Sequence, residues 1–109
     1  MNNGSSPLVT MILFAYNQEE YISDAVNGAL AQDYPFLEVI LSDDCSKDKT
    51  FQIMRDIVNS YTGPHSIVLN RNVENLGLIG HVNKCFGMAT GELIVGAAGD
   101  DISDSNRAS

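Results

Sequence analysis

Two pairs of adjacent aspartates are the residues of this sequence whose type and spacing best suit chemistry. Asp43 and Asp44 directly follow one apolar segment, and Asp100 and Asp101 follow another after a single glycine. Adjacent carboxylates repel each other unless a cation lies beside them. Hard oxygen ligands of this kind suit Mg2+ or Mn2+, which commonly complete their shell with water and substrate phosphates. The pairs therefore favour metal-assisted phosphate chemistry.

Each pair also has other interpretations. One aspartate of the later pair could cap a following helix while the other is solvated, and Asp44, Ser46 or Asp48 could cap a helix that begins near Thr50. An aspartate fixed at the end of a loop can also accept hydrogen bonds from a nucleobase or from ribose hydroxyls, without a metal. The two pairs could thus do different jobs.

Four further side chains have both a functional and a structural interpretation. Tyr16 could stack on a base or be a plain rim tyrosine. Arg71 could hold a diphosphate in a bidentate way or be an ordinary surface arginine. His65 and His81 have no paired ligand spacing, so we expect each to lie on the surface or on a helix face. The turn over residues 16–21 has no glycine, which disfavours a dinucleotide-binding or P-loop site.

Strands alternating with helices must position these residues. Apolar runs predict strands over 8–15, 38–42, 66–70 and 92–98, and apolar residues at helical spacing predict helices over 22–30, 51–61 and 79–89. Asn17 and Glu20 have the spacing of a capping box for the first helix. The alternation indicates βαβ units and a mainly parallel sheet, whose ligands bind outside the carboxyl ends of the strands. The polar residues expected to converge there are Tyr16, Asn17, Asp43, Asp44, Arg71, Asn72, Asp100 and Asp101.

The composition places these elements in one small acidic domain. The 109 residues include 14 acidic and 6 basic side chains, for a formal net charge of -8, and 44% are hydrophobic. Scattered basic residues argue against nucleic acid or an anionic membrane as a partner. The longest apolar run, residues 11–15, is far below the ~18 residues of a membrane-spanning helix. Residues 1–7 lack the features of a secretory signal, and we expect a flexible N-terminal arm there.

Cysteine usage points to a reducing compartment. Cys45 and Cys85 are the two cysteines of the sequence, and no CxxC spacing joins them. A disulfide or zinc framework is therefore unsupported, and a cytoplasmic location is expected.

Several segments together resemble the opening of family 2 glycosyltransferases. They cover residues 9–17, 29–35 and 37–46, and then Asn75-Leu76-Gly77, residues 91–94 and Gly99-Asp100-Asp101, in the order and spacing of that family. The likeness spans almost the whole chain after Pro7. It implies a truncated GT-A fold, which is a three-layer αβα sandwich with a mainly parallel, Rossmann-like nucleotide-binding sheet. Residues 8–109 would be its N-terminal nucleotide-sugar-binding part.

The resemblance also implies a role for individual residues. Asp100 and Asp101 match the DXD-type motif, in which Asp100 faces the ribose side and Asp101 binds Mn2+ or Mg2+ together with it. Tyr16 would lie near the base, and Asp44 would contact it. The full set implied to bind the nucleotide sugar is Ala15, Tyr16, Asn17, Asp43, Asp44, Arg71 and Asp100.

The implied reaction is transfer of a hexosyl group from a nucleoside-diphosphate sugar to an acceptor hydroxyl, with inversion by direct displacement. The acceptor would be a glycan or a lipid-linked molecule, in polysaccharide or cell-surface glycan synthesis at the cytoplasmic face of the membrane. Cys45 stands where glycine or asparagine is common in the family, and the two motif aspartates are adjacent rather than spaced. Family members continue past this motif into the part that carries the general base, so no base is assigned in this chain.

Two alternatives remain open from the sequence. One is a regulatory α/β domain resembling response-regulator receivers, in which clustered acids also hold magnesium. Receivers carry those acids after the first and third strands, whereas this chain carries them after the second and fourth predicted strands. The other is a degenerate fragment with a purely structural role.

Overall fold

Strands and helices alternate along the whole described part of the chain. The computed structural model describes residues 8–91 and 93–98. The elements are β1 (Val9–Ala15), α1 (Ile22–Leu30), β2 (Leu37–Asp43), α2 (Thr50–Ser60), β3 (Ser66–Arg71), α3 (Gly77–Met88) and β4 (Leu93–Ala98). Each lies within two residues of its predicted bounds, which confirms the predicted order of elements.

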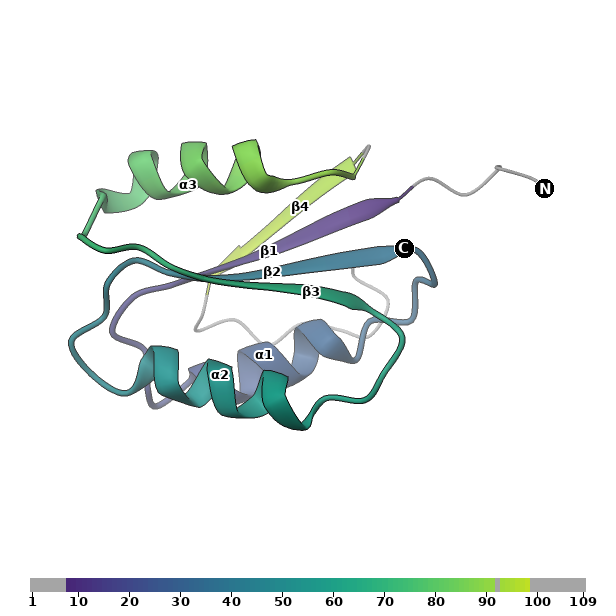
Figure 1. The fold of residues 1–109 in the computed structure, drawn as a ribbon, viewed down its shortest axis with the longest axis horizontal. Coiled ribbons are helices and arrows are strands. Elements are labelled where there is room, and N and C mark those ends of the chain that lie inside the picture. The colour runs from purple at the N-terminus through teal and green to yellow at the C-terminus, as the bar shows by residue number, and fades with distance from the viewer. Residues whose placement is uncertain (1–7, 92, 99–109) are drawn as a thin grey trace.

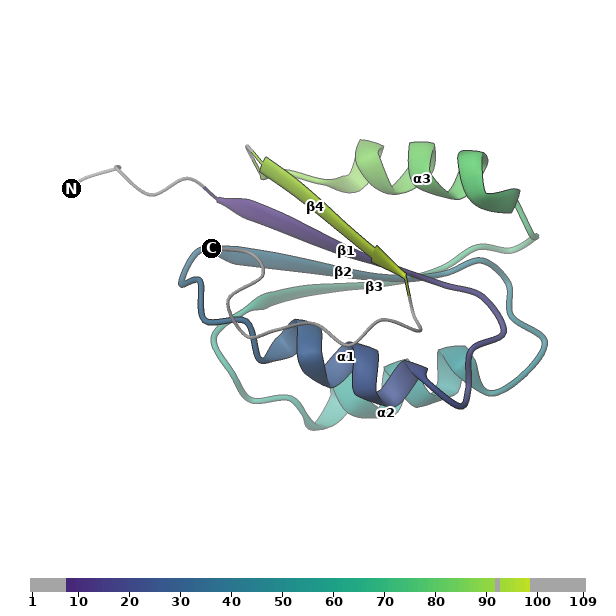
Figure 2. The same cartoon turned by 180° about the vertical axis from the view of Figure 1, so that it is seen from behind.

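The strands form one parallel sheet between two helical layers. The sheet order is β3-β2-β1-β4, and each neighbouring pair is parallel. The helices α1 and α2 cover one face and α3 covers the other, as both views of the ribbon show (Figures 1 and 2). The expected three-layer αβα sandwich is therefore confirmed. No helix among the described residues has the length and apolar character needed to cross a membrane.

The alternation of side chains along the strands divides the core between the two helical layers. Met11 and Leu13 of β1 pack with the buried residues of α1, whereas Ile12 packs on the other face with Ile40 and Cys85. The apolar stripe of α1 is fully buried, and all seven residues of β2 are buried. Strands buried on both faces need nearly continuous apolar runs, which is the pattern that the sequence shows.

The predicted capping box before α1 is wrong. The helix begins at Ile22, with no side-chain cap on its first turn. Asn17 lies four residues before Tyr21 in a left-handed conformation, with a φ of 51°. Its Oδ1 accepts the N–H of Lys47 at 2.9 Å, and its own N–H donates to Oγ of Ser46 at 2.8 Å. The two hydrogen bonds of Asn17 therefore join the loop after β1 to the loop after β2. Asparagine also adopts the left-handed backbone conformation more readily than most residues.

A buried carboxylate fastens the connection between α3 and β4 at the amino end of the sheet. Oε1 of Glu38 accepts the hydroxyl of Thr10 at 2.9 Å and the N–H of Thr90 at 3.1 Å, and Oε2 accepts the hydroxyl of Thr90 at 3.1 Å. The N–H of Gly91 in turn donates to Oγ1 of Thr10 at 2.8 Å. These four hydrogen bonds join β1, β2 and the turn into β4.

Replacing Glu38 with alanine should reduce the free energy of unfolding by about 2 kcal/mol, because the buried hydroxyl of Thr10 and the N–H and hydroxyl of Thr90 lose their acceptor. Chemical denaturation followed by circular dichroism measures the change. Glu20 is exposed and is the matched control, and its replacement by alanine should change stability by less than about 0.5 kcal/mol. Equal effects of the two substitutions would show that Glu38 does not hold the turn.

Candidate functional site

A cavity of about 310 Å3 opens at the carboxyl ends of β1 and β2, beside the start of α3. This is the edge at which ligands bind in open parallel sheets, and the volume is in the range of small-molecule sites. Its wall combines aromatic and apolar surface with a few polar groups. The lining residues are Phe14, Ala15, Tyr16, Gln18, Asp44, Asn75, Gly77, Leu78 and His81.

Among the described residues, Asp44 is the only acidic one in that lining, and it is 4% exposed. Its Oδ1 accepts Nδ2 of Asn72 at 2.8 Å and the N–H of Leu76 at 2.8 Å, while Oδ2 accepts the N–H of Gly77 at 3.0 Å. The carboxylate thus satisfies free N–H groups at the start of α3, where the helix dipole favours negative charge. A carboxylate oxygen can accept two hydrogen bonds, so Oδ2 retains capacity for one more donor.

These contacts keep Asp44 ionised. Burial by itself would raise the pKa of its carboxyl group, but hydrogen bonds from Leu76, Asn72 and Gly77, together with the charge of His81, lower the pKa below its ordinary value of 3.8. The cavity therefore presents a fixed negative acceptor at neutral pH. Asp44 caps α3, the helix after β3, and does not cap α2 as one interpretation of the sequence suggested.

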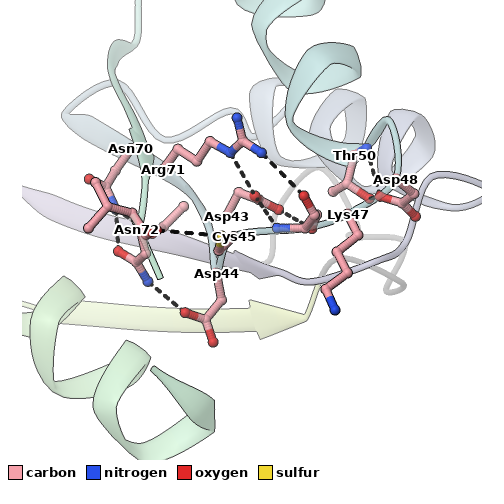
Figure 3. Close-up of polar contacts among 12 residues, drawn as sticks. Asp43, Asp44, Cys45, Lys47, Asp48, Thr50, Asn70, Arg71 and Asn72 are labelled. Atoms are coloured by element: carbon pink, nitrogen blue, oxygen red, sulfur yellow. Dashed lines mark hydrogen bonds and ion pairs between the residues drawn. The ribbon is translucent and has the colours of Figure 1, made fainter. Parts of the chain in front are cut away.

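Asp43 lies on the other face of the sheet from Asp44, as the close-up shows (Figure 3). It is fully buried, accepts the N–H of Ser46 at 2.8 Å and the Ser46 hydroxyl, and pairs with Nε of Arg71 at 3.8 Å. Arg71 also donates to the carbonyl of Ser46 at 3.3 Å and lies over the ring of Phe51. Consecutive strand residues face opposite sides, so the two aspartates serve different layers.

The structure brings together part of the residue set expected from the sequence. Ala15, Tyr16 and Asp44 line the cavity, and the Tyr16 side chain is 42% exposed there. Asp43 and Arg71 do not line it, and Asn17 lies in the adjoining loop contact. The part of these three residues in nucleotide binding stays a prediction.

Asp100 and Asp101 lie outside the described residues. The strand that precedes them, β4, runs parallel to β1 and pairs Ala98 with Phe14, so its carboxyl end is at the edge that holds the cavity. Within residues 8–91 and 93–98, no three His, Cys, Asp or Glu side chains group closely enough to hold a metal ion. The chemistry of the donor set fits a hard cation only if the two aspartates contribute.

The sequence analysis gave His81 no part in the site; it lies on a face of α3, as one of its two expected positions had it, but that face is buried. It is 3% exposed, its Nε2 lies 2.7 Å from Oγ of Ser42, and its ring meets Phe14 edge-on at 5.3 Å between centroids. Burial lowers its pKa, against the opposing charges of Asp44 and Asp43. The available signal was spacing, because His81 precedes the buried Cys85 by four residues and so shares its helix face.

Gln18 and Asn75 also line the cavity and were not singled out from the sequence. Gln18 accepts the N–H of Tyr16 through Oε1 at 3.2 Å, and Nδ2 of Asn75 donates to the carbonyl of Asp44 at 3.3 Å. Both amides therefore fix the backbone of residues that line the cavity. Polar residues in loops give no periodic signal, which is why these roles were not predicted.

Comparison with known proteins agrees with this geometry. The family model described as glycosyl transferase family 2 matches residues 10–108. The putative glycosyltransferase EpsE of Bacillus subtilis is 34% identical over 98% of this chain and 37% of its own length. The putative teichuronic acid biosynthesis glycosyltransferase TuaG of the same organism is 35% identical over 87% of this chain and 36% of its own length.

A solved structure extends the likeness to the fold. The mannosyltransferase PcManGT from Pyrobaculum calidifontis, in complex with GDP-Man and Mn2+, superposes with a TM-score of 0.81 at 30% identity, over 87% of this chain and 28% of that protein.

The described chain has the parallel α/β fold of GT-A glycosyltransferases. It belongs to glycosyl transferase family 2, as the match over residues 10–108 shows. The family assignment favours the glycosyltransferase interpretation over the receiver-like one. The chain spans about a third of the length of the relatives that it matches, at 37% and 36%.

Proposed function

We propose that this chain is the donor-binding part of an inverting glycosyltransferase that moves a hexosyl group from a nucleoside-diphosphate sugar to an acceptor hydroxyl. The observation that carries the proposal is the ionised carboxylate of Asp44, which lines the cavity and can accept one more donor. The edge N–H of a nucleobase would supply that donor. PcManGT, whose structure holds GDP-Man and Mn2+, supports the choice of donor class.

The other residues predicted to bind the nucleotide sugar would have different roles at this edge of the sheet. Tyr16 offers an exposed aromatic face on which the base can stack, a contact worth about 1–3 kcal/mol at comparable sites. Asp43 and Arg71 would act by holding the loop after β2, because both contact Ser46. Asn17 would hold the same loop through Lys47.

The acidic pair that follows β4 would hold the cation. Asp101 and Asp100 are the ligands that we propose for Mn2+ or Mg2+, with Asp100 also facing the ribose. A cation held there would neutralise the charge that develops on the departing nucleoside diphosphate. The cavity wall meanwhile fixes the base and so orients the donor for attack by the acceptor.

The name of one relative supports a proposal for the biological setting. TuaG is named for teichuronic acid biosynthesis, which supports a role in polysaccharide or cell-surface glycan synthesis with a glycan or lipid-linked acceptor. We propose that the reaction takes place in the cytoplasm, at the cytoplasmic face of the membrane. Cys45 and Cys85 are both free, which agrees with a reducing compartment.

Titration with UDP, GDP and dTDP should show binding that depends on Mn2+. At least one of the three should bind the native chain, and the replacement of Asp101 with alanine should weaken that binding by at least about tenfold, because a carboxylate ligand is lost. Isothermal titration calorimetry with and without Mn2+ measures both effects. Asp56 is the matched acidic control, since it is exposed on α2 on the far side of the sheet, and its replacement by alanine should leave binding unchanged. Failure of the native chain to bind any of the three nucleotides would contradict the proposal.

A further inference from the structure

A chain of hydrogen bonds runs behind the cavity and connects two of its lining residues. It starts at Asp44, whose Oδ1 accepts Nδ2 of Asn72 at 2.8 Å. Oδ1 of Asn72 accepts Nδ2 of Asn70 at 3.1 Å, and the same Nδ2 donates to Oγ of Ser42 at 2.9 Å. Oγ of Ser42 lies 2.7 Å from Nε2 of His81. Figure 3 shows the end of this chain at Asp44, Asn72 and Asn70.

The charge on Asp44 sets the direction of every bond in the chain. An ionised carboxylate only accepts, so Asn72 must turn its Nδ2 toward Asp44 and its Oδ1 toward Asn70. Asn70 must then present its Nδ2, and the second hydrogen of that nitrogen reaches Oγ of Ser42. Ser42 therefore accepts from Asn70, and its own hydroxyl proton is free to be donated.

The acceptor for that proton is Nε2 of His81. Cys85 is the other neighbour of the Ser42 hydroxyl, but thiol sulfur is a weak acceptor compared with an unprotonated imidazole nitrogen. Burial holds the pKa of His81 below its usual value, so the neutral ring accepts at Nε2 and carries its proton on Nδ1. The hydrogen-bond chain thus favours the tautomer of His81 that carries its proton on Nδ1.

Nδ1 of His81 is the nitrogen left for a ligand. Among the described residues, no group forms a hydrogen bond with this nitrogen. Nδ1 is also absent from the buried polar atoms there that lack a partner, so it is accessible to solvent. His81 and Asp44 line the same cavity. With its proton on Nδ1, His81 would add an N–H donor from α3 to the lining that already holds the Asp44 carboxylate.

We propose that His81 is a specificity-determining residue that selects nucleobases in which a ring N–H adjoins a keto oxygen. Asp44 accepts the ring N–H, and Nδ1–H of His81 donates to the neighbouring oxygen. Uracil, thymine and guanine present this pair. Cytosine and adenine present an unprotonated ring nitrogen beside an amino group. The Asp44 carboxylate would then face another acceptor, and Nδ1–H of His81 would face another donor. The inference rests on the proposed function, because it assigns the cavity to the base of the donor.

Two matched nucleotide pairs test the selection, since each pair exchanges the keto edge for the amino edge. With Mn2+ present, UDP should bind the native chain more tightly than CDP, or GDP more tightly than ADP if the cavity takes a purine. Replacement of His81 with phenylalanine removes the donor and keeps an aromatic ring. It should reduce the preference for the keto member by about tenfold, through weaker binding of that member alone.

Two further variants make the result decisive. Replacement of His81 with asparagine places an amide N–H where Nδ1 lies and should retain part of the preference. His65, which packs against Tyr61, does not line the cavity, and its replacement by phenylalanine should leave the preference at the native value. Thermal unfolding confirms that each variant is folded.

The outcomes separate the two proposals. A native preference that survives in the phenylalanine variant overturns the role of His81, and so does an equal loss of affinity for both members of a pair, which would indicate a structural role only. Equal native affinity for keto and amino members also overturns it, while leaving the proposed function in place. If the native chain binds no nucleoside diphosphate, the proposed function fails and this inference falls with it.

Discussion

Replacement of Asp44 with alanine is expected to lower the free energy of unfolding by about 3 kcal/mol and to abolish nucleoside-diphosphate binding. Three donors, Nδ2 of Asn72 and the N–H groups of Leu76 and Gly77, would lose their shared acceptor. The start of α3 would also lose the negative charge that complements its dipole. Urea unfolding and calorimetric titration measure the two losses on the same protein.

The pH dependence of stability identifies the ionised carboxylate as the cause. Because the pKa of Asp44 in the folded chain lies below its ordinary value of 3.8, the stabilisation is fully present above that value and is lost as the pH falls through the folded pKa. The stability gap between the native chain and the Asp44→Asn variant should therefore be constant from neutral pH to about pH 4 and then narrow. A gap that widens in acid would contradict this account, and Asp56→Ala should show almost no gap at any pH.

Replacement of Gly91 with alanine should destabilise the fold by about 3 kcal/mol, lowering the unfolding midpoint by about 12–24 °C. A Cβ atom at Gly91 would lie 2.6 Å from the backbone nitrogen and Oγ1 of Thr10 and 2.8 Å from the carbonyl oxygen of Leu8. Two of those atoms belong to the backbone of the strand segment at β1, which lies between two neighbouring strands and cannot yield as a side chain can. Differential scanning calorimetry measures the midpoint.

Gly87 provides a control, because its replacement by alanine should change the free energy of unfolding in the opposite direction. It lies in α3, and a Cβ atom there would meet nothing within 4 Å. Alanine is a better helix former than glycine, so Gly87→Ala should stabilise the chain by about 0.5–1 kcal/mol. If both alanine variants were destabilised to the same extent, the steric explanation for Gly91 would be incorrect.

The fold could be predicted from the sequence because its signals are periodic. The apolar run of β1 and the stripe of Ile22, Ala25, Val26 and Ala29 in α1 each report one kind of burial directly. Alternation of such segments then leaves few possible topologies. The predicted convergence of strand ends is confirmed at Tyr16 and Asp44, which line one cavity.

The division of roles within the site could not be predicted in the same way. Asp43 and Asp44 are identical in type and adjacent in sequence, and they differ only in which helical layer they face. His81 looks like any helix-face histidine until a partner such as Ser42 is known to lie 2.7 Å away. Non-periodic contacts between distant segments decide these roles, and a single sequence does not display them.

The all-buried strand β2 also limits how this chain can change its length. Asp43 faces α1 and α2, whereas Ser42 and Asp44 contact residues of the opposite layer. Because side chains alternate, one residue inserted into β2 would turn every later side chain to the opposite face and send the Asp44 carboxylate away from α3. Only an insertion or deletion of two residues would leave each later side chain of β2 on its original face of the sheet. We therefore expect insertions and deletions to be tolerated in the exposed turn at residues 62–64 and not within β2.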